Sequence, residues 1–327
     1  MLFGAHESVA GGLHLALERA RADQCGAVQI FTKNKSAWAE PEHSAEQTSL
    51  FREAHGALGR DVAVMAHTSY LINLAADDST VLARSKAALA AELRRCSALG
   101  VGSCVLHPGA HLGLGQRLGI RRVIDSLREV LEGTRRARCR LLLENTAGQG
   151  TCLGSRFDEI AEILEALPDR RVGVCFDTQH AFAAGYDLIG ESAYERTLAD
   201  LEDTIGLRRV FAVHVNDSKR ELGSRVDRHA QVGEGFLGMP VFQRLANDPR
   251  FEKTPAVIEV PPTGPKEAPY RDQVARLAML ARPAIQGVVK GGEAGSVVPP
   301  SLEVECRTIA VAGGSSYSTG GRLGRRS

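Results

Sequence analysis

The 327-residue sequence contains seven cysteines but no Cys-x-x-Cys pair. An odd number of cysteines without paired spacing argues against a disulfide framework and against a thiolate zinc site. We therefore expect most of these cysteines to be small buried hydrophobic residues. Any metal ion would then have to be held by imidazole nitrogens and carboxylate oxygens.

Long hydrophobic runs are also missing. No stretch reaches the roughly 18 consecutive apolar residues that a transmembrane helix requires. The first residues, MLFGAHESVAGG, have neither the basic start nor the apolar segment of a signal peptide. We therefore expect a cytoplasmic protein that does not enter a membrane, and one associated with the nucleoid if the source is bacterial.

The sequence has little excess of charge of either sign, with 40 basic and 39 acidic residues and a net charge of +1. Domains that bind nucleic acids are usually clearly basic. Overall charge therefore does not identify a nucleic-acid-binding protein here, and any binding to nucleic acid must depend on local clusters of basic residues.

Short apolar segments alternate with longer segments of helical periodicity, and the alternation repeats eight times. A helix is predicted over residues 80–99, for example, where Leu82, Leu89, Leu93 and Cys96 recur at helical spacing. The predicted strands are residues 2–6, 27–31, 62–67, 103–108, 140–145, 172–178, 209–217 and 255–260.

Eight such units predict an α/β fold, a (β/α)8 TIM barrel, with a doubly wound open sheet as the alternative. The barrel is favoured because six of the eight strands end in a potential ligand: His67, His107, Glu144, Asp177, His214 and Glu259. The carboxyl ends of barrel strands converge on one rim, so these side chains would surround a single pocket. We predict one barrel domain over residues 1–282 and a flexible Gly- and Ser-rich tail over 283–327.

Three further residues, His180, Asp227 and His229, extend the set to five histidines and four carboxylates. One such residue alone is more often a hydrogen-bonded structural residue, but nine at successive strand ends favour metal binding. These donors suit Zn²⁺, with Mn²⁺ or Fe²⁺ as substitutes. Because a zinc ion takes about three or four protein ligands, nine donors with one bridging carboxylate suit a three-metal cluster. Such a cluster keeps a positive charge and can hydrolyse phosphodiesters.

The sequence closely resembles endonuclease IV, the family of metal-dependent apurinic/apyrimidinic endonucleases, over residues 2–282. The matching segments are GAHES (4–8), FTKN (31–34), HTSYLINLA (67–75), LHPGAH (106–111), ENTAGQG (144–150), CFDTQHAFAAGYD (175–187), HVNDSKRELGSRVDRHAQVGEG (214–235) and IEV (258–260). The resemblance implies an enzyme that cuts the phosphodiester 5′ to an abasic site, leaving a 3′-hydroxyl and a 5′-deoxyribose phosphate, and that also removes 3′ blocking groups.

The resemblance also implies how the ligands divide among three zinc ions. His67 and His107 would bind one ion, and Glu144 would bridge it to a second. The second ion would also be held by Asp177, His214 and Glu259, and the third by His180, Asp227 and His229. Glu144, Asp177 and Glu259 are accordingly the predicted catalytic residues.

Damaged double-stranded DNA is the implied partner, and a monomer without an obligate protein partner is expected. Tyr70 and Leu71 resemble a wedge that fills the base stack after the abasic nucleotide is flipped out, although Tyr70 could instead pack within its loop. Backbone phosphate contacts, or alternatively solvated charges, are expected at Lys219, Arg220, Arg225 and Arg228. Lys35 stands where the family often carries an arginine that enters the DNA.

Two other functions fit parts of the pattern. A barrel sugar isomerase or epimerase also gathers His, Asp and Glu on one rim, but it needs only one or two metals. A catalytically silent metal protein that binds damaged DNA is the second alternative. The Asp227-Arg228-His229 triplet and the loop around Tyr70 favour the nuclease.

Overall fold

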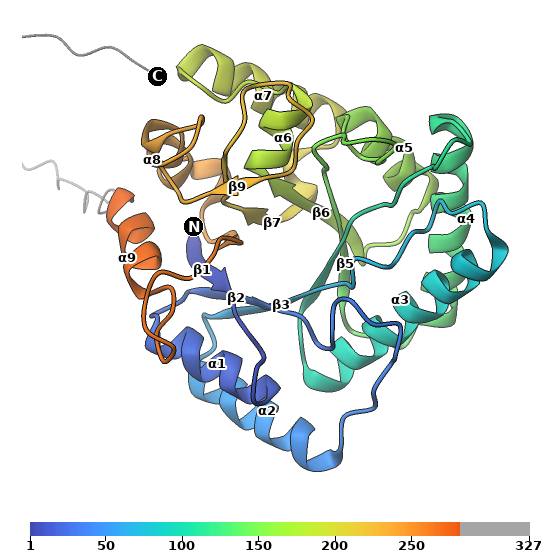
Figure 1. The fold of residues 1–327 in the computed structure, drawn as a ribbon, viewed down its shortest axis with the longest axis horizontal. Helices are drawn as coiled ribbons and strands as arrows, with labels where there is room; N and C mark the ends of the chain where they lie inside the picture. Colours follow the sequence, from blue (N-terminus) through green and yellow to red (C-terminus); the bar gives the residue numbers. More distant parts are fainter. Residues whose placement is uncertain (282–327) are drawn as a thin grey trace, which may run out of the picture. The chain divides into compact units, whose positions relative to one another are not determined.

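Eight parallel strands close into a barrel in the computed structural model, which describes residues 1–281 (Figure 1). Around the barrel the strands follow the order β1-β10-β7-β6-β5-β4-β3-β2. They are β1 (Leu2–His6), β2 (Ala27–Ile30), β3 (Ala63–His67), β4 (Ser103–Leu106), β5 (Arg140–Glu144), β6 (Val172–Asp177), β7 (Val210–His214) and β10 (Pro255–Ile258). The predicted TIM barrel is confirmed, and the open sheet is excluded. The predicted tail lies outside the described residues, so its boundary stays a prediction.

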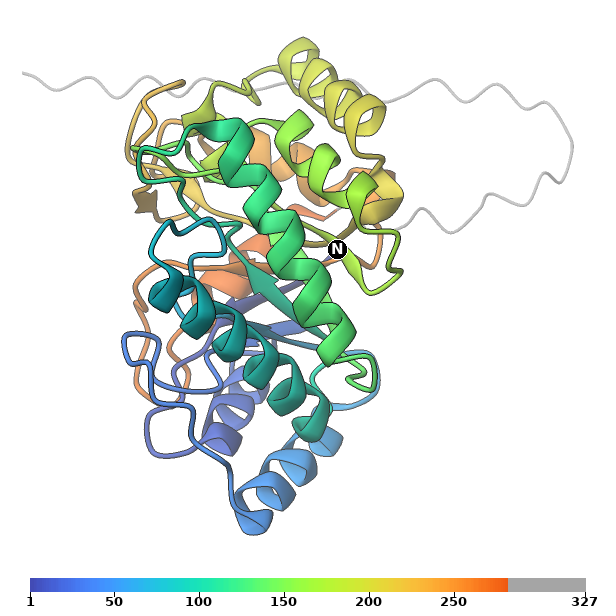
Figure 2. The ribbon, with the colours of Figure 1, turned by 90° about the vertical axis from the view of Figure 1, so that its right-hand side faces the viewer.

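Helices surround the barrel, and α3 and α4 pack side by side on its outside (Figure 2). The helices are α1 (Leu13–Ala22), α2 (Ala45–Leu58), α3 (Ser79–Leu99), α4 (Gln116–Gly133), α5 (Phe157–Ala166), α6 (Thr178–Ala184), α7 (Glu191–Thr204), α8 (Met239–Ala246) and α9 (Arg271–Leu280). Helix α3 begins where the Asp78 side chain accepts hydrogen bonds from the N–H groups of Thr80 and Val81, and it ends at Gly100 in the left-handed conformation.

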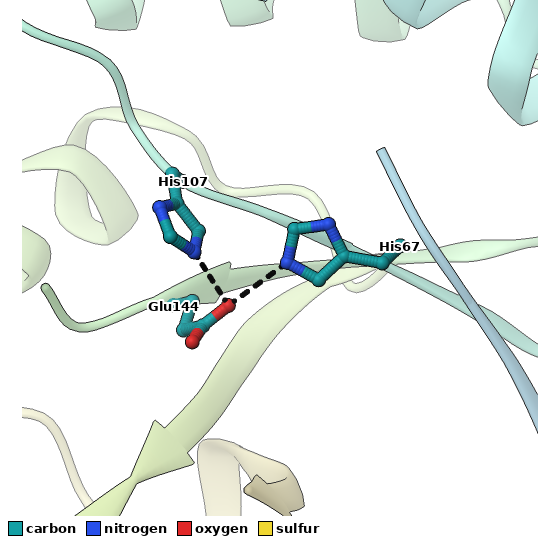
Figure 3. A group of neighbouring side chains, drawn as sticks. All are labelled: His67, His107 and Glu144. Atoms are coloured by element: carbon teal, nitrogen blue, oxygen red, sulfur yellow. Dashed lines mark hydrogen bonds and ion pairs between the residues drawn. The ribbon is translucent and has the colours of Figure 1, made fainter. Parts of the chain in front are cut away.

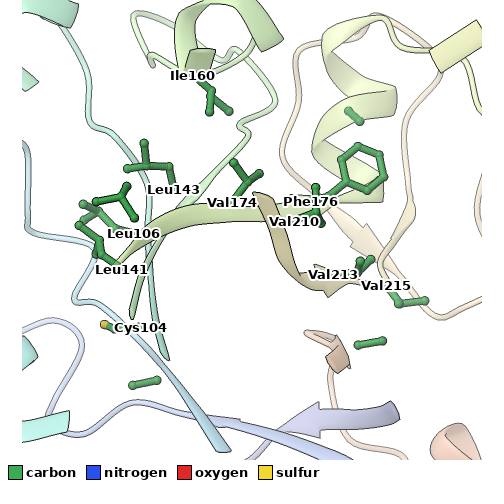
Figure 4. Packing of buried hydrophobic residues seen from close by; sticks show 14 of the residues in the cluster. Cys104, Leu106, Leu141, Leu143, Ile160, Val174, Phe176, Val210, Val213 and Val215 are labelled. Atoms are coloured by element: carbon green, nitrogen blue, oxygen red, sulfur yellow. The ribbon is translucent and has the colours of Figure 1, made fainter. Parts of the chain in front are cut away.

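The strands are buried on both faces, which explains why they are continuous apolar runs in the sequence. One apolar layer lies inside the barrel and takes one residue from most strands: Ala27, Met65, Val105, Leu142, Cys175, Ala212 and Val257. A larger layer lies between strands and helices, where Leu143 and Val174 pack near Ile160 of α5 (Figure 4). Five of the six cysteines among residues 1–281 are buried, as expected.

Several predicted strands extend one to three residues beyond the observed ones at the carboxyl end, and the strands predicted to begin at residues 62 and 209 each begin one residue too early. His107 directly follows β4, and Glu259 directly follows β10. At this rim the backbone leaves the ladder of parallel hydrogen bonds, and the side chains turn toward the mouth of the barrel. Within residues 1–281, no helix combines the length and apolar character needed to cross a bilayer.

A buried pair of carboxyl groups joins the end of β1 to the end of α1. Glu7 and Asp23 are each 1% exposed, and neither oxygen of Glu7 accepts a hydrogen bond. Burial, followed by a hydrogen bond to Asp23, raises the pKa of Glu7 to about 9. A pKa in this range keeps Glu7 protonated at neutral pH beside Asp23, whose Oδ2 accepts from the backbone N–H of Tyr270 at 3.0 Å.

Candidate metal centre

All nine predicted ligands lie at the carboxyl ends of the barrel strands or in the segments that follow them, with His180 in helix α6. Several of them line a cavity of about 580 Å³, together with aromatic and cationic side chains: His6, Phe31, Lys35, His67, Thr68, Ser69, Tyr70, Ile72, His107, Gln149, His180, Asp227, Arg228, His229, Glu259, Val260 and Tyr270. Convergence on one rim follows from the parallel direction of the strands. The residues from distant parts of the sequence therefore form one site.

Glu144 is fully buried at the centre of this site, and its two oxygens face different groups. Oε2 lies 3.2 Å from Nε2 of His67 and 3.0 Å from Nε2 of His107 (Figure 3). Oε1 lies 3.0 Å from Nδ1 of His214 and 3.0 Å from Nδ1 of His180. A carboxylate with its oxygens divided in this way can bridge two metal ions.

Two groups of side chains share Glu144. In the first, donor atoms of Glu144, His67 and His107 lie within 4.8 Å of one another. In the second, the donors come from Glu144, Asp177, His214 and Glu259. Both sets have enough donors for a divalent ion and match the division expected from the sequence.

The third group forms around helix α6. Asp177 ends β6 and caps α6 by accepting a hydrogen bond from the N–H of His180, which places that histidine in the first turn. His180 and His229 each direct Nε2 toward Asp227, at 3.5 and 3.3 Å. Asp177 also lies within 4.8 Å of both histidines, so it is an additional potential donor that the sequence did not assign here.

The orientation of the histidines suits metal binding, because their outward nitrogens are already occupied. Nδ1 of His67, His180 and His229 lies 2.9, 2.9 and 3.0 Å from the backbone carbonyls of Thr68, Asn145 and Glu259, respectively. A carbonyl only accepts, so each Nδ1 must donate, and the neutral ring keeps its lone pair on Nε2. Nε2 of His180 and of His229 is buried without a hydrogen-bond partner. An ion beside Asp227 would satisfy both atoms.

The charges of the site are strongly coupled. Burial opposes the charged form of Glu144, but the imidazoles of His214 and His107 outweigh burial and hold the pKa of this carboxyl well below its usual value. Burial likewise lowers the pKa of His180, but Asp177, followed by Asp227, raises it well above the ordinary value. Buried carboxylates that keep their charge require positive partners, and metal ions can provide them.

Polar residues that sequence reasoning missed hold the carboxylates in place. Asn216 donates from Nδ2 to Asp177 at 2.6 Å and to Glu259 at 3.2 Å. Gln29 donates to Glu259 at 2.7 Å. Asn145 accepts from the backbone N–H of Asp177 at 2.8 Å. A signal was present in the sequence, since Asn145 and Asn216 follow predicted ligands closely and Gln29 interrupts an apolar strand.

Asp217, also missed, fixes the loop that carries part of the third group. It is fully buried and accepts backbone hydrogen bonds from Gly233, Gly235 and Leu237, at 2.9 to 3.0 Å. The short antiparallel pair β8 (Asp217–Ser218) and β9 (His229–Ala230) brings His229 back to the end of β7. The loop that carries Asp227 and His229 is therefore held by hydrogen bonds on both sides of these two residues.

The predicted wedge residues differ in their surroundings. Tyr70 is 60% exposed and lines the cavity. Its ring meets Phe31 edge-on, with centroids 5.5 Å apart, and Nζ of Lys35 lies 5.2 Å from its centroid. Leu71 is partly buried and is not among the residues that line the cavity. Tyr70 therefore packs against residues of its own surroundings and still exposes most of its side chain at the cavity.

The four basic residues predicted to contact backbone phosphates are exposed, but they do not all line the same cavity. Lys219, Arg220 and Arg228 line a neighbouring hollow of about 660 Å³ with the exposed ring of Phe236. Arg228 lines the central cavity as well. Arg225 lines neither space, and its left-handed backbone, with φ 54°, is held by a hydrogen bond from its N–H to the carbonyl of Ala183.

Other residues with potential metal-binding atoms are not among the nine proposed ligands. Glu92 and Cys96 lie close to Cys104, but the oxygens of Glu92 accept from Thr32 and Arg95, which satisfies this buried carboxylate without an ion. His6 lies outside the nine ligands, and its Nδ1 lies 3.3 Å from Glu259.

Comparisons with known proteins identify the family of this chain. The model of the family described as xylose isomerase-like TIM barrel matches residues 17–280. A probable endonuclease 4 of Chloroflexus aurantiacus is 43% identical over 283 residues, covering 86% of this chain and 99% of that protein. A probable endonuclease 4 of Geobacter sp. strain M21 is 44% identical over 261 residues, covering 80% and 92%.

Comparison with solved structures indicates the same family. The crystal structure of endonuclease IV from Thermus thermophilus matches with a TM-score of 0.75 and 36% identity, covering 85% of this chain and 99% of that one. A D-tagatose 3-epimerase-like protein matches with a TM-score of 0.64 but only 19% identity, covering 86% and 98%, which shows a shared fold alone. The resemblance noted in the sequence is confirmed, and the chain belongs to the endonuclease IV family, within the xylose isomerase-like TIM barrels.

Proposed function

We propose that this chain is a DNA-repair endonuclease, a phosphodiester hydrolase of the deoxyribonuclease IV type. It would cut 5′ to an abasic site, leaving a 3′-hydroxyl and a 5′-deoxyribose phosphate, and would also remove 3′ blocking groups. The main observation in support is the division of the two Glu144 oxygens between His67 and His107 on one side and His214 on the other. Such a division would let one carboxylate hold two ions close together, as hydrolysis of a phosphodiester by several metals requires.

Three zinc ions would occupy the site, with Mn²⁺ or Fe²⁺ as possible substitutes. The nine residues that would hold them are His67, His107, Glu144, Asp177, His180, His214, Asp227, His229 and Glu259. When bound, such ions supply a hydroxide nucleophile at neutral pH and stabilise charge on the attacking and leaving oxygens. The residues fit the ions because the inward nitrogens of His180 and His229 are buried and have no other partner.

The chain's own side chains would bind and orient the DNA. With its ions bound, the site would keep a positive charge that attracts a phosphodiester, and cationic residues at the cavity wall would add to this attraction. Lys35 and Arg228 line this wall and would contact backbone phosphates. The exposed ring of Tyr70 would fill the space left by the flipped abasic nucleotide. All the proposed ligands come from one chain, so we propose a monomer without an obligate protein partner. We also propose that it acts in the cytoplasm.

Elemental analysis and a nicking assay on the same preparation test this proposal. We expect about three divalent ions per chain and a single nick 5′ to the abasic site in a labelled duplex. Undamaged duplex of the same sequence serves as the control and should stay intact. One or two ions, no nicking, and isomerisation of a sugar substrate would instead favour the epimerase-like alternative.

A further inference from the structure

Gln29 is a polar residue inside an otherwise apolar strand. Along β2, Ala27 belongs to the layer inside the barrel, while Val28 and Ile30 belong to the layer under the helices. Successive side chains of a strand point to opposite faces, so Gln29 points into the barrel, one step nearer the mouth than Ala27. Its exposure is 0%, and a buried amide must find hydrogen-bond partners.

Two partners of Gln29 are proposed ligands of the same metal ion, and the third is Nδ1 of His6, which lies 3.0 Å from its Nε2. Nε2 of Gln29 donates to Oε1 of Glu259 at 2.7 Å, and Oε1 of Gln29 lies 2.9 Å from Nε2 of His214. The reverse orientation of the amide would press its oxygen against a carboxylate oxygen, and neither of these can donate. The chemistry of the neighbours therefore fixes the orientation of the amide.

This orientation determines which nitrogen of His214 carries the proton. The amide oxygen only accepts, so Nε2 of His214 must donate to it, and the lone pair of the neutral ring lies on Nδ1. Nδ1 is the atom that faces Oε1 of Glu144 at 3.0 Å and Oε2 of Glu259 at 3.1 Å. It therefore points to the centre of the second group of donors.

The amide of Gln29 also determines which oxygen of Glu259 faces the second group of donors. Oε1 accepts from Gln29 and lies beside His6, so it is directed away from the other ligands. Oε2 remains on the side of His214 and lies 3.2 Å from Nδ2 of Asn216. One buried amide thus holds two neighbouring ligands in complementary orientations.

We propose that Gln29 is a positioning residue that sets the tautomer of His214 and the orientation of Glu259, so that both present a lone pair to one metal ion. This inference rests on the proposed metal-dependent function. His67, His180 and His229 are oriented by backbone carbonyls, which no substitution removes. His214 depends on a side chain instead, so a single substitution can release it.

Gln29→Leu tests the proposal, because leucine fills a similar volume without polar atoms. Met65→Leu, in the same interior layer, is the matched control. Loss of a hydrogen-bonded partner behind a metal ligand typically weakens metal binding about 10- to 100-fold. We expect Gln29→Leu to release one ion at a chelator concentration about 10- to 100-fold lower than the parent requires, while the remaining ions stay bound. Retention equal to the parent would overturn the proposal.

Nitrogen-15 NMR of the histidine side chains provides a readout that does not depend on bound metal. Without metal, Nδ1 of His214 faces two carboxylate oxygens and carries a proton as well, so the readout is the Nε2–H group. In the metal-free parent we expect the Nε2 signal of a hydrogen-bonded N–H, and in Gln29→Leu we expect this hydrogen bond to be lost. An unchanged His214 signal would overturn the inference, whereas a parent that binds no metal would contradict the proposed function alone.

If Gln29→Leu does not fold, Gln29→Met decides the question. A methionine at this position keeps an unbranched side chain but has neither the amide donor for Glu259 nor the amide acceptor for His214. We expect it to lose the hydrogen bond of the His214 Nε2–H group and to weaken metal retention. Retention equal to the parent, or an unchanged Nε2 signal, would contradict the proposed role.

Discussion

Replacement of Tyr70 by alanine should weaken binding to abasic DNA and leave the fold intact. The ring is 60% exposed at the cavity mouth, and its edge contacts with Phe31 and His67 hold it in place. Partial burial, followed by the nearby carboxylates of Glu259 and Glu144, raises the pKa of Tyr70 to about 12, so the phenol stays neutral beside DNA phosphates. The loop itself depends on Ser69, whose hydroxyl donates to the carbonyl of Lys35 at 2.6 Å.

The expected magnitude follows from the loss of one stacking side chain. Such a loss costs about 1 to 3 kcal/mol, which corresponds to an increase in Kd of about 5- to 150-fold. The free energy of unfolding should change much less, by about 0.5 kcal/mol, because an exposed side chain contributes little to it. Metal content should be unchanged, since the loop beside His67 keeps its own hydrogen bonds.

Fluorescence titration with a cleavage-resistant phosphorothioate duplex, with and without an abasic site, measures the effect. Tyr70→Phe keeps the ring and should bind like the parent. Met279→Ala removes a side chain that is 77% exposed on α9, and it should also bind like the parent. If Tyr70→Ala binds the damaged duplex as tightly as the parent, the wedge role is refuted.

Three further predictions concern the metal bridge, pH and the tail. Glu144→Gln should fold but lose cleavage by about 100-fold or more, because an amide offers only one oxygen and misplaces the ions; near-parental nicking would exclude Glu144 as the bridge. Because folding raises the pKa of Glu7 from 4.5 to about 9, its contribution to stability is complete at low pH and is lost as pH rises through this range. Thermal melts should therefore show Glu7→Gln gaining stability relative to the parent between about pH 5 and about pH 9, and a constant difference would contradict this. Deletion of residues 283–327 should leave nicking largely unchanged, since every proposed ligand precedes them; loss of most activity would show that the tail contributes to the barrel.

The strands and most potential ligands could be predicted from the sequence. Strands of a closed parallel barrel are covered by helices outside and by side chains inside, so their apolar runs stand out. Each run ends at the rim, where a polar residue such as His67, Glu144 or Asp177 becomes conspicuous. The ends of the strands were less accurate, because the point at which the backbone leaves the ladder depends on its neighbours.

The sequence by itself determined the barrel and the family and indicated the set of nine proposed donors, because these depend on residue type and local spacing. Only the tertiary structure decided which atom of each donor faces inward. Gln29 reaches His214 and Glu259 across sequence separations of 185 and 230 residues, and closure of the barrel brings them together. Hydrogen-bond direction depends on three-dimensional neighbours, so the tautomer of His214 and the free oxygen of Glu259 become visible only when the strands are assembled.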